Sequence, residues 1–180
     1  MLFLSIAHSQ TRTYTSLDAL YLDWGLGVGS LVQLDGGLNV MLDQHHYARL
    51  SYAHAFEPKG EFPIIAASPE NQMHTFGLSY GRFWQKRHTR FVLSGGLAYS
   101  RIERQRKAEL SGYGSVTYSL DYRAEPVHLA SVLLQVRVQK FLSSWQGMAL
   151  KLDLQLNTEQ PVVSTGVSWL IGYNKSEKRK

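Results

Sequence analysis

The sequence predicts an all-β domain, folded as an eight-stranded antiparallel up-and-down transmembrane β-barrel. Three observations support this fold class. Segments of about ten residues alternate between bulky apolar side chains and small or polar ones, as membrane-spanning strands do. The polar positions are mainly Gly, Ser, Ala and Thr, instead of the charged residues that fill roughly a quarter to a third of a soluble surface. The connections expected at one end are short, and both long connections fall at the other end.

The composition limits the other classes. The 180 residues suit one domain, and no apolar run approaches the roughly 18 residues that a membrane-spanning helix needs. The absence of cysteine excludes disulfides, thiolate metal sites and cysteine nucleophiles. The net charge of +5 comes largely from one long connection and the last seven residues, so we expect no nucleic-acid partner.

The two chain ends differ from the middle in composition. Residues 1–10 resemble the end of a secretory signal peptide, because an apolar stretch precedes the small-x-small sequence Ala7-His8-Ser9. An ordinary N-terminus is the alternative. We expect the barrel domain at residues 11–173 and a basic C-terminal tail at residues 174–180.

The first three strands are expected at residues 20–31, 37–42 and 47–56. In the first strand, bulky apolar residues alternate with Asp23 and three glycines, which leave room in the lumen for large side chains from across the barrel. A short link at residues 34–36 is expected to join the first two strands.

The next four strands are expected at residues 73–83, 89–102, 127–141 and 147–157. Alternation in the third of these has one exception, Leu133, which falls on the polar side. The fourth alternates most sharply, with four leucines on one side and four polar or charged residues on the other. Because successive side chains point to opposite faces of a sheet, we expect the apolar face to meet lipid.

The connections between these strands separate by length. Short turns are expected at residues 43–46, 84–88 and 142–146, and all three belong to the same end of an up-and-down barrel. The long connections at residues 57–71 and 103–125 belong to the opposite end. Short periplasmic turns with longer outer loops are typical of outer-membrane barrels.

Aromatic residues gather at the short-turn end of the expected barrel. An interfacial girdle of aromatic residues is typical of membrane barrels. The sequence predicts that this girdle contains Tyr47, Trp84, Phe141, Trp145 and Tyr173.

The eighth strand, residues 162–173, carries the sharpest resemblance to a known family. Val167, Trp169, Ile171 and Tyr173 form an alternating apolar series with an aromatic end. In this the chain resembles the small bacterial outer-membrane barrels, such as the transmembrane domain of OmpA. The resemblance implies a location in the outer membrane, contact with its lipid and lipopolysaccharide, recognition of the last strand by the barrel-assembly machinery, and a monomer without cofactor. The chain departs from the family's pattern in its basic tail after the aromatic residue.

A few charges fall on the lumen side of the expected strands. Buried charges need partners, so we predict one polar network of Asp23, Arg49, Arg137, Lys151 and Asp153. Such a network could gate an ion-conducting interior or plug it. We favour the plug, because the interior of eight strands is just wide enough for side chains.

Catalysis and metal binding have weak candidates. His54 and His74 are expected to face each other, but neither a carboxylate nor a third histidine joins them, so we predict no metal site. A lipid A deacylase of this size needs a histidine beside a serine. The nearest pair, His128 and Ser131, points to opposite faces of a strand, so we predict a protein that is not an enzyme. A soluble periplasmic barrel that binds a small apolar ligand is the other alternative.

The long connection at residues 103–125 and the end of the strand before it offer surface chemistry. Arg101, Arg104, Arg106 and Lys107 could bind lipopolysaccharide phosphates, or they could form a solvated charged loop. The tyrosine-rich remainder could extend the flanking strands and offer an adhesive edge. The sequence therefore predicts a structural or surface-interaction role and leaves the partner open.

Overall fold

The computed structural model describes residues 16–43, 45–56, 71–110, 118–123, 126–159 and 161–174. These residues form nine antiparallel strands. The strands are β1 (Leu17–Gly29), β2 (Val32–Leu42), β3 (His46–Phe56), β4 (Asn71–Lys86), β5 (Thr89–Leu110), β6 (Tyr118–Arg123), β7 (Val127–Phe141), β8 (Gln146–Leu156) and β9 (Val162–Asn174).

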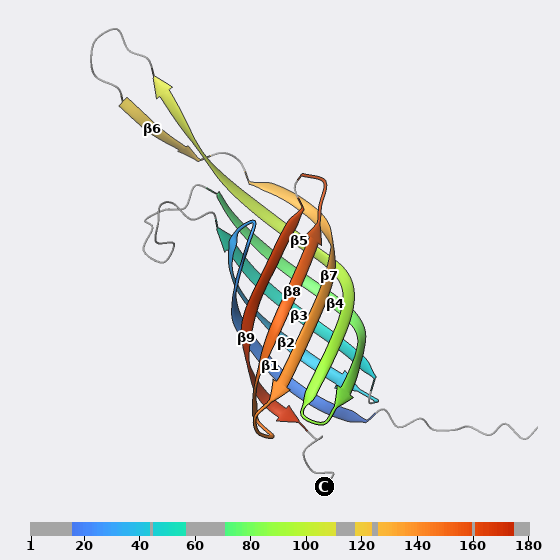
Figure 1. The fold of residues 1–180 in the computed structure, drawn as a ribbon. Coiled ribbons are helices and arrows are strands. Elements are labelled where there is room, and N and C mark those ends of the chain that lie inside the picture. Colours follow the sequence, from blue (N-terminus) through green and yellow to red (C-terminus); the bar gives the residue numbers. More distant parts are fainter. Residues whose placement is uncertain are drawn as a thin grey trace, which may run out of the picture.

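Eight of the strands close into a barrel (Figure 1). Each barrel strand pairs with its neighbour in the chain, with β5 pairing β7 directly, and β1 closes the barrel against β9. The predicted fold class is therefore confirmed. Closure satisfies the backbone hydrogen-bonding groups of every barrel strand without leaving an edge, as a structure in lipid requires.

The alternation of side chains assigns the two faces of the wall. On β8, Leu150 and Leu152 are 63% and 48% exposed, whereas Lys151 and Asp153 between them are 3% and 8% exposed. The other barrel strands follow the same rule, so the bulky apolar faces point outward. Faces that point outward cannot line an internal apolar cavity, which a barrel binding an apolar ligand in its lumen would need.

Several strands are longer than the sequence predicted. β2 begins at Val32, so the link expected at residues 34–36 is part of a strand. Pairing with both β1 and β3 keeps this segment extended, although it contains two adjacent glycines. Trp84 lies in β4 and not in the following turn, and Asn174 belongs to β9 and not to the tail.

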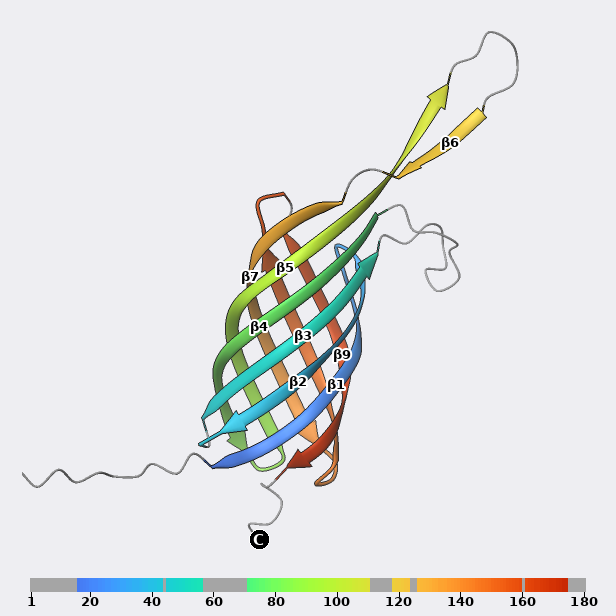
Figure 2. The same cartoon turned by 180° about the vertical axis from the view of Figure 1, so that it is seen from behind.

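The two ends of the barrel differ as the connection lengths predicted. The turns that follow β2, β4 and β7 lie at the end where β1 begins and β9 ends. At the opposite end a two-stranded ribbon formed by β5 and β6 projects well beyond the barrel, and both views show it (Figure 2). We call these ends the short-turn end and the ribbon end.

The ribbon is a continuation of a barrel strand. The last pair of β4 with β5 is Asn71 with Arg104, and beyond it β5 pairs with β6 from Gln105, opposite Arg123, to Leu110. Six further residues at about 3.4 Å each carry the ribbon about 20 Å past the barrel wall.

Candidate functional site

The middle of the lumen contains a layer of ion pairs. Arg49 Nη2 lies 2.7 Å from Asp23 Oδ1 and 3.2 Å from Asp35 Oδ2. Arg137 Nη1 donates to the other oxygen of Asp23, and Lys151 Nζ donates to the other oxygen of Asp35. Five strands supply these groups, so the layer ties the wall together across the barrel.

All five residues of the predicted polar network are buried in the lumen. Asp153 lies at the margin of the layer, with Oδ2 4.0 Å from Lys151 Nζ and Oδ1 accepting a hydrogen bond from Gln135. Asp35 was missing from the prediction, although it bridges two of the cations. It could have been found, because it has the same parity as Asn39 on β2, but it fell in the segment that was interpreted as a link.

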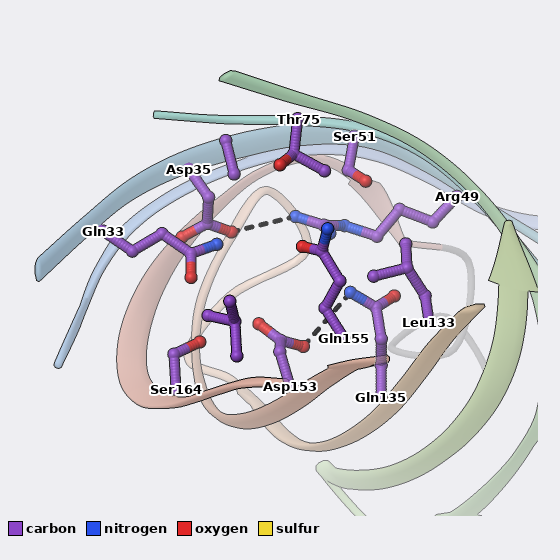
Figure 3. A pocket seen from close by; sticks show the side chains of 12 residues that line it. Gln33, Asp35, Arg49, Ser51, Thr75, Leu133, Gln135, Asp153, Gln155 and Ser164 are labelled. Carbon is purple, nitrogen blue, oxygen red and sulfur yellow. Dashed lines mark hydrogen bonds and ion pairs between the residues drawn. The ribbon is translucent and has the colours of Figure 1, made fainter. Parts of the chain in front are cut away.

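A small cavity lies against this layer, on the side of the ribbon end. Its volume is about 30 Å³, which is room for water but not for a larger solute. In Figure 3, Arg49 extends toward Asp35 on one side of this cavity, and Gln135 extends toward Asp153 on the other. The described side chains thus leave only water-sized space in the lumen at this level.

Two glycines make room for the large lumen side chains. A Cβ atom at Gly37 would lie 2.8 Å from Arg49 Nε, and one at Gly77 would lie 2.7 Å from Leu133 Cδ1. Leu133, the exception in the alternation, therefore points into the lumen with its polar neighbours because a glycine on another strand leaves space for it.

The short-turn end of the lumen is closed by a mainly apolar floor. The rings of Tyr21 and Phe141 meet edge to face at 5.7 Å, and Tyr47 donates a hydrogen bond to Asn39. Arg90 is buried in the same floor over the Phe141 ring, at 4.7 Å from its centroid. The floor consists of Ala19, Tyr21, Met41, Tyr47, Phe83, Val92, Phe141, Ala149 and Leu170.

The floor corrects two members of the predicted girdle. Tyr47 is 0% exposed and Phe141 is 5% exposed, so neither can contact lipid. Both have the parity of lumen residues. Their position near the short-turn end predicted the girdle, but their parity decides the face on which they lie. Trp84, Trp145 and Tyr173 do lie on the outside, where the Trp145 and Tyr173 rings are 6.3 Å apart.

Histidines and one arginine form a row across the outer wall near the ribbon end. The register places His54, His74, Arg101 and His128 opposite one another on four successive strands. The rings of His54 and His74 are stacked with centroids 4.6 Å apart. Within the described residues, no group of three His, Cys, Asp or Glu side chains is placed to hold a metal ion.

The pair considered for catalysis is not brought together. His128 is exposed on the outside, where its Nδ1 lies 2.5 Å from the hydroxyl of Tyr99. Ser131 is buried in the lumen and accepts a hydrogen bond from Gln155. The barrel wall therefore separates the two side chains.

The predicted phosphate-binding residues lie on one long strand. Arg101 is exposed and forms an ion pair with Glu103, with a distance of 2.9 Å. Arg104, Arg106 and Lys107 belong to β5, but their side chains lie outside the described part of the structure.

Comparisons with known proteins give a result for the fold. In the part of the chain that is described, no helix is long and apolar enough to cross a membrane. No protein-family model matches the chain, and no curated protein matches it in sequence.

Solved structures, in contrast, match along most of the chain. The N-terminal β-barrel domain of Pseudomonas aeruginosa OprF superposes with a TM-score of 0.61 at 10% identity, covering 87% of this chain and 98% of that one. Neisserial surface protein A gives a TM-score of 0.58 at 9% identity, over 88% and 99% of the two chains. The Yersinia pestis outer-membrane protein Ail in a phospholipid nanodisc gives 0.51 at 9% identity, over 87% and 99%.

The fold and the apolar outer wall together define the class of protein. The chain is an eight-stranded transmembrane β-barrel of the bacterial outer-membrane type, and its fold is that of the OprF and NspA barrels.

Proposed function

We propose that this outer-membrane barrel is a surface-interaction protein whose binding element is the β5–β6 ribbon, and that it is not an enzyme. The observation that carries the proposal is the continuation of β5 for six paired residues beyond the barrel. The short-turn end faces the periplasm in barrels of this type, so the ribbon projects from the cell surface.

The ribbon offers unpaired strand edges. The last residue of β5 that pairs with β4 is Arg104, and the last that pairs with β7 is Ile102. Within the described residues, β6 pairs with β5 alone. An isolated two-stranded ribbon is only marginally stable in water. An extended segment of a partner that adds a strand to one edge would supply backbone hydrogen bonds and further burial.

The register of the ribbon pairs residues of like type. Lys107 stands opposite Asp121, and Ala108 stands opposite Leu120. Charged and apolar residue types thus alternate along the ribbon, and this alternation would favour one register for an added strand.

The filled lumen supports a role outside the barrel instead of transport through it. The floor, the ion-pair layer and a remaining cavity of about 30 Å³ leave little space for a solute. We infer that the lumen network is a structural plug.

The experiment compares three forms of the protein on the surface of otherwise identical cells. One variant replaces residues 106–122 with Asn-Gly, which closes β5 and β6 in a tight turn. A second replaces the same residues with a Gly/Ser segment of equal length, which keeps the reach without the strands. Folding of both variants is checked by gel electrophoresis without boiling. A folded barrel that resists detergent migrates faster than the boiled protein, and both variants should keep this shift.

Binding is then measured to a set of immobilised extracellular-matrix and serum proteins. Cells with the parent protein should bind at least one of them above vector-only cells, and both variants should lose that binding by about tenfold, or roughly 1.4 kcal/mol. A parent no better than the vector control, or variants that bind as the parent does, would contradict the ribbon as binding element.

A second proposal concerns lipopolysaccharide, whose phosphates we propose are contacted by Arg101, Arg104, Arg106 and Lys107. It is supported by the exposed position of Arg101 between His74 and His128 in the outer row, since guanidinium groups pair well with phosphate. Native mass spectrometry with phosphorylated and dephosphorylated lipid A tests it. Equal binding of the two lipids would exclude a phosphate site, and altered lipid A on overexpression would favour the rival enzymatic role.

We further propose that the chain is monomeric and that its last strand is read by the barrel-assembly machinery.

A further inference from the structure

The outer surface at the β4–β5 turn is hollowed. The hollow has a volume of about 640 Å³ and lies at the short-turn end, on the outside of the barrel. Its lining includes Lys86, Arg87, His88 and Lys140, and no Asp or Glu is among the residues that line it. We propose that this hollow binds the headgroup of an anionic phospholipid in the periplasmic leaflet of the membrane.

The cations are placed to surround one headgroup. The register sets Lys86 opposite Thr89 and Thr89 opposite Lys140, so the two lysines stand on the outward face two strands apart, about 10 Å. Arg87 lies at the tip of the turn, where it is exposed. A phosphate between these groups would be near three positive charges, with no carboxylate among the residues lining the hollow to compete for them.

Aromatic rings mark the depth of the hollow in the membrane. Trp84 and Phe91 stand opposite each other on the outward face, with ring centroids 5.8 Å apart. They lie two residues, about 7 Å along the strand, further toward the middle of the membrane than Lys86 and Thr89. Aromatic rings are enriched at the level of the headgroups. A lipid in the hollow would therefore rest its acyl chains on the rings and its phosphate among the cations.

The turn is held in place before a lipid arrives. Arg87 has a positive φ of 54°, a conformation that favours glycine. The carbonyl of Arg87 accepts a hydrogen bond from Gln85, which in turn accepts one from the buried Arg90. Arg90 also donates to Asn174 at the end of β9. The turn is thus tied to the floor of the lumen, and its position of positive φ carries an arginine instead of a glycine.

The test uses the fluorescence of Trp84 in the full-length barrel. Trp24, Trp145 and Trp169 are replaced by phenylalanine, and the protein is refolded into phosphatidylcholine vesicles that contain brominated phosphatidylglycerol or brominated phosphatidylcholine. Bromine quenches the indole only in the adjacent lipid, so the two titrations give relative association constants at the hollow. We expect phosphatidylglycerol to associate at least tenfold more strongly.

Charge-removing variants then test whether the preference for phosphatidylglycerol comes from the basic residues of the hollow. Lys86→Gln, Lys140→Gln and Arg87→Gly should each lower it about fivefold, since one basic residue near a membrane surface contributes about that factor. Arg87→Gly also relieves the backbone, so its loss of preference cannot come from misfolding of the turn. Glu159→Gln, which changes one exposed charge at the opposite rim, is the matched control and should change nothing.

Three results would overturn the proposal. The first is equal association of the two lipids in the parent, and the second is a preference that survives all three variants. The third is a preference that millimolar inorganic phosphate abolishes, since that would identify a site for soluble anions. The gel-mobility shift of each variant establishes that the barrel is folded, and none of the outcomes depends on the role of the β5–β6 ribbon.

Discussion

Replacing Asp23 with asparagine tests the ion-pair layer directly. Asp23 accepts hydrogen bonds from Arg49 and Arg137, and all three side chains are at most 3% exposed. Asparagine keeps the shape but has one acceptor oxygen, and its amide group would face a guanidinium donor. Removing one partner of a buried ion pair costs about 3–5 kcal/mol, because the remaining charge stays buried.

Asp23 pairs with two cations, but the substitution should leave only one of them without a nearby carboxylate. The expected loss of unfolding free energy is therefore that of one ion pair and not of two. Arg49 retains Asp35 at 3.2 Å, so its charge keeps a carboxylate. Arg137 keeps only a distant one, with Nη2 3.9 Å from Asp35 Oδ2. We therefore expect Asp23→Asn to lower the free energy of unfolding by about 3–5 kcal/mol, chiefly through Arg137.

Urea unfolding of the barrel in lipid vesicles, followed by tryptophan fluorescence, measures this loss. Asp153→Asn is the matched control, because Asp153 lies 4.0 Å from Lys151 Nζ, which keeps its closer partner Asp35. The control should lose only about 1 kcal/mol, because an asparagine oxygen still accepts the hydrogen bond from Gln135. Equal losses in the two variants, at unchanged m-values, would refute the view that Asp23 holds the layer together.

The remaining predictions concern one glycine on each face of the wall and two leucines on the outside. Gly37→Ala should destabilise the barrel by about 1–3 kcal/mol in the same unfolding assay, because its Cβ would lie 2.8 Å from both Arg49 Nε and Leu50 O. Gly95→Ala should be nearly neutral, because the atom nearest to its Cβ would be 3.5 Å away. Leu150→Lys, in the middle of β8 and 63% exposed to lipid, should cost about 2–4 kcal/mol, whereas Leu142→Lys at the short turn should cost about 1 kcal/mol or less. Similar costs for both lysines would mean that Leu150 does not face the membrane interior.

The fold follows from local rules that the sequence carries openly. Leucines at every second position of β8, against Lys151 and Asp153, suffice to assign both faces of the strand, because the pleat sends successive side chains to opposite sides. The lumen position of Arg49, Arg137 and Asp23 follows in the same way. The lengths of the turns fix which connections share an end.

The alternation of faces also explains the two aromatic residues that were predicted for the girdle but lie in the lumen. Tyr47 and Phe141 belong to the floor because a strand cannot turn one side chain to the other face without a bulge. Asp35 was missed because residues 34–36 were interpreted as a link, and only pairing with strands on both sides keeps that segment extended.

The sequence by itself therefore determined the fold class, the direction of each face and most members of the lumen network. The tertiary structure alone decided which charges meet, since Asp23 and Arg137 are 114 positions apart and touch across the lumen only after the barrel closes. It alone also decided that β5 and β6 continue into a ribbon and that cations from β4, the following turn and β7 line one hollow. The physical reason is that alternation is a property of each strand, whereas these contacts depend on the register between strands and on barrel closure, which no single strand encodes.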